Sequence, residues 1–375
     1  MKILFLSAAK SIHTIRWVNS LALRGHEIHL VFKKDHQIEG QDVLQKDICL
    51  HPLRYTGMAG YYLNARQLKK LVKQIKPDVI NVHYASGYGT LARRARLNSY
   101  LLSVWGSDVY DFPNESIIKK YILKKNIKYA KYLASTSYCM ANQLKRVMND
   151  EKLDIHITPF GVDLKEFDPY KYMQKKKNCI IIGNIKTLEK KYGINELILA
   201  FADLKKDLDK SDSKIKIKLK IYGKGSLKEE LVKLISRKGL EQDVELMGAI
   251  SHEKVPAALA EFDIFCALSQ LDSESFGVSV VEAMAMGRPV VVSDVDGFKE
   301  VTTNETGRIV PRNDLESVKR ALKELVVDEH LRIRLGENGK KRVLELYDWD
   351  KNVDTMEMLY KSILVSKENK NETEI

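Results

Sequence analysis

Two glutamates eight positions apart are the residues of this chain whose type and spacing most directly suggest a chemical function. Glu274 and Glu282 lie in Ser-Glu-Ser-Phe-Gly-Val-Ser-Val-Val-Glu-Ala-Met-Ala-Met-Gly-Arg, residues 273–288, on either side of a Phe-Gly turn. The apolar run 278–286 predicts a buried helix. Eight residues make a little over two helical turns, so Glu282 is predicted to point back toward the region of Glu274.

The start of this predicted helix suits a phosphate. The backbone N–H groups of Phe276, Gly277 and Val278 are expected to be free there, and Gly277 has no side chain to block an anion. Two neighbouring carboxylates can accept hydrogen bonds from sugar hydroxyls. The segment, with Ser275 included, therefore predicts a nucleotide-sugar pocket in which one acid binds the sugar and the other binds the ribose.

This segment resembles the Glu-x7-Glu motif of glycosyltransferase family 4, a family of retaining enzymes with the GT-B fold. The resemblance continues through residues 287–300, Gly-Arg-Pro-Val-Val-Val-Ser-Asp-Val-Asp-Gly-Phe-Lys-Glu, where the family has a strand and a glycine-rich loop. A surface glutamate on an ordinary helix is the alternative for Glu282, but the length of the matching context favours the functional interpretation. The resemblance implies that Glu274 orients the sugar and Glu282 the ribose.

The resemblance also implies two cations on the donor diphosphate. The family has an Arg and a Lys five positions apart in the loop that begins here at Gly183, which is itself assigned to the donor, and this chain has Lys186 and Lys191 at that spacing. Two cations would offset the charge that develops on the departing nucleoside diphosphate, although lysine provides a point charge where arginine provides a bidentate fork. The alternative is that both are solvated surface lysines, like Lys190 beside them.

Four further positions are assigned to the donor by the same resemblance. Gly223 and Gly225 follow a predicted strand and resemble the family's Gly-x-Gly turn near the donor, while the alternative is a tight turn without a ligand. Met247 and Gly248 fall where the family encloses the base. Apolar residues at such positions can equally belong to the core.

Two loops in the first half of the chain depart from the family's pattern. The first loop, Ala-Ala-Lys-Ser-Ile-His at 8–13, lacks the two glycines at which acceptor and donor phosphate meet in the family, and Lys10 or His13 could substitute for them. In Val-Trp-Gly-Ser-Asp, residues 104–108, Trp105 replaces a family histidine that touches the transferred sugar. Trp105 could instead stack on a sugar face.

Two more residues of the first half are predicted to be catalytic. Asp108 keeps the acid of the family's His-Gly-x-Asp pattern. His83 ends the preceding predicted strand and is the best remaining histidine for the expected site. A histidine at a strand end is structural about half of the time, so a core role is the alternative for His83.

The elements that must position these residues alternate between strands and helices along the whole chain, which predicts α/β architecture with parallel sheets flanked by helices. The pattern restarts after the charged run 171–178. The resemblance implies two Rossmann-like domains facing across a cleft. The expected parts are an acceptor-binding domain, a nucleotide-sugar-binding domain, a terminal helix that crosses back to the first domain, and a disordered tail, at 1–168, 169–345, 346–365 and 366–375 respectively.

The net charge of +12 is concentrated in the first half of the chain. Residues 1–170 contain 26 Lys and Arg against 15 Asp and Glu, whereas residues 171–375 contain 36 against 35. A basic face can attract nucleic acid, an anionic membrane or an anionic substrate. Basic residues surround the apolar stripe of two predicted helices, 64–75 and 117–131, which are expected to be either solvated faces or sites that dock on anionic lipid.

The sequence contains no apolar run of about 18 residues, and its start reads as a strand rather than a signal peptide. The expected location is therefore cytoplasmic, with peripheral attachment to the inner face of the cell membrane left open. Three Asp-x-Asp pairs in unrelated contexts are ascribed to chance, so we predict no metal and no cofactor. The cysteines are scattered without metal-ligand spacing, which indicates a reducing compartment; they are Cys49, Cys139, Cys179 and Cys266.

These observations predict a retaining, metal-independent glycosyltransferase that moves a sugar from a UDP-linked donor to a hydroxyl of a glycan acceptor. The basic first half favours a lipid-linked acceptor, as in bacterial capsule or O-antigen assembly. Since no second carboxylate nucleophile is evident, the acceptor is expected to attack from the face that the diphosphate leaves.

Two other functions remain open at this point. A nucleotide-sugar 2-epimerase on the same fold would convert the donor without an acceptor, but it would need additional acid/base residues. A basic nucleic-acid-binding protein would fit the charge, but the sequence lacks interleaved aromatic and basic residues and a recognised binding motif. We therefore predict no nucleic-acid partner.

Overall fold

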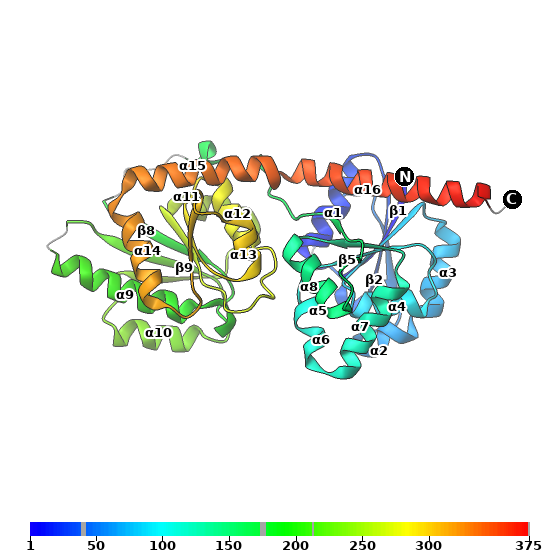
Figure 1. The fold of residues 1–375 in the computed structure, drawn as a ribbon, viewed down its shortest axis with the longest axis horizontal. Helices are drawn as coiled ribbons and strands as arrows, with labels where there is room; N and C mark the ends of the chain where they lie inside the picture. The colour runs from blue at the N-terminus through cyan, green and yellow to red at the C-terminus, as the bar shows by residue number, and fades with distance from the viewer. Residues whose placement is uncertain (39–42, 173–177, 212–213, 374–375) are drawn as a thin grey trace. The chain divides into compact units, whose positions relative to one another are not determined.

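The chain forms two compact units, which are drawn in Figure 1. The computed structural model describes residues 1–38, 43–172, 178–211 and 214–373, with the backbone alone at 367–373. One unit comprises Met1–Pro159 and Lys351–Ile375, and the other comprises Phe160–Asp350. Within the described residues, no helix is both long enough and apolar enough to cross a membrane.

The first unit is built on a seven-stranded sheet in the order β3-β2-β1-β4-β5-β6-β7, and all neighbouring strands are parallel. Ile3, Leu4, Phe5 and Leu6 of β1 are fully buried, as expected for a parallel strand that is covered on both faces. The strands are β1 (Lys2–Leu6), β2 (Glu27–Lys33), β3 (Cys49–Leu53), β4 (Val79–His83), β5 (Leu101–Val104), β6 (Tyr132–Ser135) and β7 (His156–Ile157).

Helices connect these strands and bury their apolar faces on the sheet. Two of the longer ones, α7 and α8, begin at serine caps; in α7 the Ser116 hydroxyl accepts a hydrogen bond from the Lys119 N–H at 3.2 Å. The helices are α1 (Ile12–Leu23), α2 (Gly57–Leu63), α3 (Ala65–Ile75), α4 (Gly87–Arg94), α5 (Ser107–Tyr110), α6 (Phe112–Glu115), α7 (Ile117–Tyr129) and α8 (Tyr138–Met148). A short 3-10 helix, η1 (Lys34–His36), follows β2.

The second unit repeats the architecture with a six-stranded parallel sheet in the order β10-β9-β8-β11-β12-β13. Its strands are β8 (Ile180–Ile185), β9 (Ile217–Tyr222), β10 (Val244–Gly248), β11 (Ile264–Ala267), β12 (Val290–Ser293) and β13 (Gly307–Val310). Its helices are α9 (Ile194–Lys210), α10 (Lys228–Arg237), α11 (Val255–Glu261), α12 (Val278–Ala285), α13 (Asp296–Val301), α14 (Leu315–Val327) and α15 (Glu329–Leu346), with 3-10 helices η2 (Pro169–Lys171), η3 (Lys190–Tyr192) and η4 (His252–Lys254). The predicted α/β class with two Rossmann-like units is confirmed.

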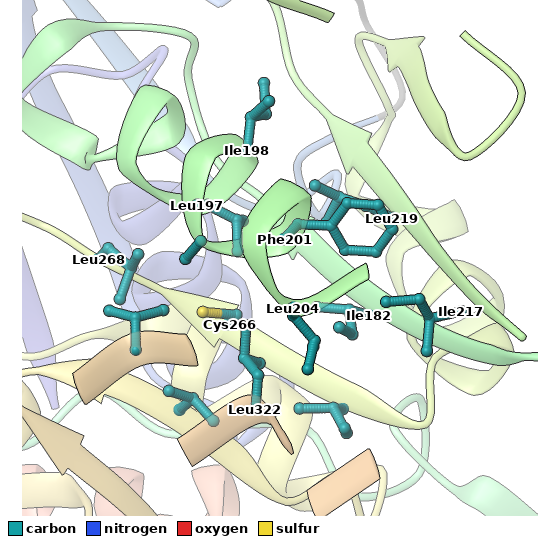
Figure 2. Packing of buried hydrophobic residues seen from close by; sticks show 14 of the residues in the cluster. Ile182, Leu197, Ile198, Phe201, Leu204, Ile217, Leu219, Cys266, Leu268 and Leu322 are labelled. Carbon is teal, nitrogen blue, oxygen red and sulfur yellow. The ribbon is translucent and has the colours of Figure 1, made fainter. Parts of the chain in front are cut away.

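Figure 2 shows how the core of the second unit is packed. Phe201 and Leu204 of α9 lie against the sheet residues Ile182 and Leu219, and all four side chains are fully buried. Burying each side chain of this size stabilises the fold by roughly 1.5–3 kcal/mol. This packing gives the strand ends, where the candidate site lies, a rigid support.

The chain passes between the units at different positions from those expected. The first crossing falls at Pro159–Phe160 rather than at 168, and the charged run expected near it lies partly, at 173–177, outside the described residues. The last helix, α16 (Trp349–Thr373), belongs to the first unit from Lys351 onward, where the Asn81 amide donates to the Tyr360 hydroxyl at 2.7 Å. This helix also continues through most of the tail that was expected to be disordered, since the tail's Lys and Glu residues are good helix formers.

Candidate active site

The carboxyl edge of the second sheet brings together most of the residues predicted to bind the donor. Strand β8 has β9 on one side and β11 on the other, so the order in which successive strands are added to the sheet reverses between β8 and β11. Open α/β sheets bind ligands beyond the carboxyl ends of the strands at such a switch point. The loops that follow β8 and β11 are joined there, because the Gln270 N–H donates to the Lys191 carbonyl at 2.8 Å.

Lys186 and Glu274 form an ion pair at this switch point. Their side chains are only 18% and 13% exposed. The Ser269 hydroxyl also donates to the Glu274 carboxylate at 3.3 Å. The structure thus joins the residue predicted to bind the diphosphate to the acid predicted to orient the sugar.

Lys191 is more exposed than Lys186 but belongs to the same cluster. The Lys186 and Lys191 ammonium groups lie 4.7 Å and 5.1 Å from the ring centroid of Tyr192. A cation near an aromatic ring is attracted by its negative face. Tyr192 was not singled out in the sequence, and both predicted cations lie near its ring.

The start of α12 has the conformation that the sequence predicts for a phosphate site. Gly277 precedes it with φ of +81°, and a Cβ there would lie 2.7 Å from the Phe298 ring, so glycine is required on both conformational and steric grounds. The N–H groups of Phe276, Gly277 and Val278 form no hydrogen bond within the described chain. These amides can therefore donate to an anion.

Two of the residues assigned to this loop support it from inside the unit. Ser275 and Phe276 are buried. The Phe276 ring makes edge contacts with Phe160 and Tyr347 at centroid distances of 5.8 Å and 5.5 Å. The side chain of Phe276 therefore anchors the turn, and its backbone is the part available to a ligand.

Glu282 has a partner that the sequence did not reveal. Its carboxylate is buried and lies 3.0 Å from Nε2 of His252, whose ring packs against Phe167. His252 is in η4, in the segment that follows β10 at the same sheet edge. Only its position after a predicted strand could have indicated a role. The contact orients the acid that is predicted to bind the ribose.

The Gly-x-Gly turn packs against the backbone of the loop that carries Lys186. Gly223 has φ of +153°, and its N–H donates to the Gly248 carbonyl at 2.7 Å. A Cβ on Gly223 would collide with the Lys186 carbonyl, and one on Gly225 with the Leu188 carbonyl. Both glycines therefore let the loops after β8 and β9 lie against each other.

The structure corrects the assignment of Gly183 and places Met247 at the rim. Strand β8 runs to Ile185, so Gly183 lies inside the strand, where a Cβ would collide with the Phe262 ring. Gly183 is thus needed for packing inside the strand and does not lie in the loop in which it was expected. Met247 is half-exposed at the end of β10, beside Gly248, as a residue that encloses a base would be.

The Asp-x-Asp pair nearest to this edge has separate cationic partners. The Asp294 carboxylate is paired with Arg312 at 3.1 Å, and that of Asp296 with Lys299 at 2.9 Å. Within the described residues, no group of three or more His, Cys, Asp or Glu side chains is arranged to hold a metal ion.

The carboxyl edge of the first sheet carries a cluster of aromatic rings. His83 ends β4, Trp105 follows β5 and His13 lies in α1. The Trp105 ring is 4.4 Å from the His83 ring and 5.7 Å from the His13 ring, measured between centroids. The structure thus brings together the rings of three of the five residues predicted for this unit.

His83 itself is a core residue in this cluster, which corrects its catalytic assignment. It is 1% exposed, and neither ring nitrogen has a hydrogen-bond partner within the described chain. Burial lowers the pKa of His83 to about 3, and the nearby His13 acts in the same direction. The ring is therefore neutral at ordinary pH, and it presents neither nitrogen to solvent.

Asp108 is also a positioning residue rather than one that meets a substrate. Its buried carboxylate accepts hydrogen bonds from the N–H groups of Ala85, Trp105 and Gly106 at 2.7, 3.1 and 2.9 Å. Burial raises the pKa of Asp108 despite these three donors. The acid joins the loop after β4 to the loop after β5 and so holds Trp105 in place.

Lys10 lies apart from these contacts. Its side chain is exposed, and its ammonium donates to the Asp35 carbonyl at 3.2 Å. In this structure it ties the first loop to η1, and nothing places it beside Trp105.

Two family models match consecutive parts of the chain. The model described as "Glycosyl transferases group 1" matches residues 170–342, and that described as "Glycosyl transferase 4-like" matches residues 2–137. The two matches correspond to the second and the first unit respectively.

Curated relatives agree with these matches. An uncharacterized glycosyltransferase of Methanocaldococcus jannaschii is 29% identical over 67% of this chain, and the match spans 62% of the relative's own length. The N-acetyl-alpha-D-glucosaminyl L-malate synthase of Bacillus anthracis is 24% identical over 93% of this chain and 92% of its own. The phosphatidyl-myo-inositol mannosyltransferase of Mycolicibacterium smegmatis is 24% identical over 90% of this chain and 86% of its own.

A solved structure shows the same fold. The Anabaena protein HepE in complex with UDP superposes with a TM-score of 0.78 at 15% identity. The match covers 96% of this chain and 100% of HepE.

Proposed function

Because the chain belongs to glycosyltransferase family 4, whose enzymes have the GT-B fold, we propose that it is a retaining transferase with a UDP-linked donor. The observation that carries this proposal is the Lys186–Glu274 ion pair at the switch point of the second sheet, beside the free amides of α12. HepE, which has the same fold, has been solved with UDP. That complex supports uracil as the base of the donor.

The free enzyme holds its diphosphate cation and its sugar-binding acid together. When a donor enters, the diphosphate takes Lys186 and Lys191, and Glu274 is released to accept hydrogen bonds from the sugar. Glu282, oriented by His252, accepts from the ribose hydroxyls. Each acid then has one task, and the amides at the start of α12 complete the phosphate site.

The transfer breaks the bond between the sugar C1 and the diphosphate oxygen and forms one between C1 and the acceptor oxygen. The negative charge moves to the departing diphosphate, where two cations and the α12 amides stabilise it. The acceptor approaches from the same face, so the configuration at C1 is retained. On that face the departing oxygen is the nearest base for the acceptor's proton. We propose that this charge is balanced without a metal ion.

The acceptor is proposed to be a lipid-linked glycan made at the cytoplasmic face of a membrane, as in capsule or O-antigen synthesis. The positive charge of the first half supports an acceptor that carries phosphate. A relative with 90% coverage of this chain is a phosphatidyl-myo-inositol mannosyltransferase, whose acceptor is a lipid by its name. The Trp105 ring is the surface proposed to stack on an acceptor sugar.

The test is thermal stabilisation of the full-length protein by a panel of nucleotides and nucleotide sugars. A ligand that binds the native state raises the melting temperature. We expect UDP-sugars to stabilise the wild type more than GDP- or ADP-sugars, and Glu282→Gln to lose most of the stabilisation by UDP-sugars because its contact with the ribose is weakened. Glu253→Gln, at the exposed position that follows His252 in the sequence, serves as the matched control. Equal stabilisation by all nucleotides would reject the UDP assignment, and stabilisation by none would reject the pocket.

Retention is tested on the product. The anomeric configuration of the transferred sugar, read by NMR, is expected to match that of the donor. An inverted product would exclude attack from the face that the diphosphate leaves.

A further inference from the structure

The first unit has a concave surface away from the residues described above. It is a groove with a volume of about 990 Å³, to which the loop before α2 and the helices α2, α3, α4 and α7 contribute. Its cations come from three of these helices and from the turn after α4: Arg66, Arg93, Arg94, Arg96, Lys125 and Lys128. We call these residues and the surface between them the basic groove.

The charges of the basic groove are not balanced by acids. No Asp or Glu lies among the residues that line it, and none of its six cations is in an ion pair within the part of the chain that the structure describes. Six like charges around one hollow repel one another. In the second unit, in contrast, Arg312 is paired with both Asp272 and Asp294. An anion would relieve this repulsion.

Two of the arginines are held in place. The Arg93 Nε donates at 2.8 Å to the amide oxygen of Asn126. Asn126 is buried, and its side-chain nitrogen donates to the Ala85 carbonyl. The Arg94 guanidinium lies 5.6 Å from the centroid of the Tyr62 ring. Fixed guanidinium groups suit phosphate because they offer paired donors.

The helix α7 continues this surface with exposed apolar residues. Ile118, Tyr121, Lys125 and Lys128 are spaced by three, four and three residues, which places them on one face of the helix. Ile118 is 71% exposed, and Ile117 beside it is 89% exposed. On this face the first turn of α7 is therefore apolar and exposed, and Lys125 and Lys128 of the basic groove lie further along the same face of the helix.

We propose that the basic groove and the first turns of α7 form a docking surface for a bilayer of anionic phospholipids. The groove binds headgroup phosphates, and Ile117, Ile118 and Tyr121 enter the interface between headgroups and acyl chains. A soluble polyanion would satisfy the cations but would leave the apolar end in water, so the combination favours a lipid surface. This deepens the proposed function, because a surface of this kind brings the enzyme to a lipid-linked acceptor.

The experiment is co-sedimentation of the full-length protein with vesicles of phosphatidylcholine, with or without phosphatidylglycerol. We expect binding only to vesicles that contain phosphatidylglycerol, and binding that weakens as salt rises. The double variant Arg94→Glu/Arg96→Glu is expected to weaken binding by at least about tenfold. The control Lys233→Glu/Lys238→Glu makes the same charge change on exposed positions of the second unit and is expected to leave binding unchanged.

A second variant separates a membrane from a soluble anion. Ile117→Asn/Ile118→Asn is expected to weaken vesicle binding by about tenfold while leaving the melting temperature unchanged, since both side chains are exposed. The lipid assignment would be overturned if this variant bound vesicles as well as the wild type and if a competing RNA oligonucleotide or inorganic polyphosphate abolished that binding. Equal binding to uncharged vesicles would overturn the role of the groove.

The readout is independent of catalysis. Vesicle binding requires neither donor nor acceptor, and the stabilisation by UDP-sugars is measured on the same variants without vesicles. A protein that responds to UDP-sugars but not to vesicles would reject the docking surface alone. A protein that binds vesicles but no nucleotide would reject the proposed function alone.

Discussion

The carboxyl edges of the two sheets occupy equivalent places in equivalent folds but differ in charge. The edge of the second sheet carries the Lys186–Glu274 ion pair, with Lys191 beside the same tyrosine ring as Lys186. At the edge of the first sheet, the aromatic cluster contains Trp105 and a His83 that burial keeps neutral. The difference teaches which edge can stabilise a departing anion. An uncharged hydroxyl or sugar ring needs no such charge, and an aromatic face suits it better.

The largest effect is expected at the charged edge. Lys186→Ala removes a cation from the leaving group and leaves Glu274 without its ion-pair partner. We expect kcat for transfer to fall by about 10²–10³-fold. Steady-state kinetics with the donor identified by the thermal panel would measure this.

Lys190→Ala is the control. It removes a lysine from the same loop, but Lys190 is exposed and is not assigned to the diphosphate. Its kcat is expected to equal that of the wild type. Should Lys186→Ala retain nearly full activity, the contrast in charge between the two edges would have no catalytic meaning.

The next effect concerns how the stability of the first unit depends on pH through His83, at the edge of the first sheet. In the folded chain the pKa of His83 is about 3, against roughly 6.5 when unfolded, so the unfolded chain takes up the proton first as pH falls. The stability associated with neutral His83 is present above the unfolded pKa and is lost as pH falls toward about 3. Between pH 7 and pH 5 we expect a loss of about 2 kcal/mol in the free energy of unfolding.

Urea unfolding followed by tryptophan fluorescence measures this, because Trp17 and Trp105 both belong to the first unit. The variant His83→Gln is expected to lower stability at pH 7 but to lose this part of the pH dependence. An identical pH dependence in the variant would show that His83 is solvated and accessible, and its catalytic assignment would then be restored.

A smaller effect is expected when the aromatic surface is removed. Trp105→Ala is expected to raise KM for the acceptor by about tenfold, because it removes the ring proposed to stack on a sugar. Trp105→Phe should recover part of this loss. Affinity for UDP, measured by calorimetry, should remain that of the wild type, and a matching loss of UDP affinity would contradict the division of labour between the edges.

The last prediction is an absence of effect. If the two lysines and the α12 amides carry the diphosphate charge, then EDTA should leave the rate of transfer unchanged. Activity that is lost in EDTA and restored by Mg²⁺ or Mn²⁺ would show that a metal ion supplies charge at this edge instead.

The features that sequence reasoning predicted well are those that depend on neighbours along the chain. Alternating strands and helices follow from local hydrophobic pattern, and the observed strand order agrees with that architecture. The free amides before α12 follow from the Phe-Gly turn itself. Lys186 and Glu274 follow strands β8 and β11, so their placement at one sheet edge follows from the rule for parallel sheets.

The features that it missed depend on residues that are distant in sequence. Gly183 was expected in a loop, but its strand is longer and Phe262 fills the space beside it. Glu282 is met by His252, thirty positions away, through a contact that no local pattern encodes. Asp108 keeps its family position, yet only the folded loops reveal that its oxygens are already occupied by backbone N–H groups.

By itself, the sequence determined the fold class, the family and the chemical types available for donor binding, because these depend on periodicity and on short motifs. The tertiary structure decided which of these side chains are accessible and which are fully engaged. It also assembled the basic groove from α2, α3, α4 and α7, which no single helix could indicate. The physical reason is that packing between residues distant in sequence decides which side chains are buried and which hydrogen-bond or ion-pair partners they have. The role of a polar residue therefore depends on neighbours that only the folded chain brings to it.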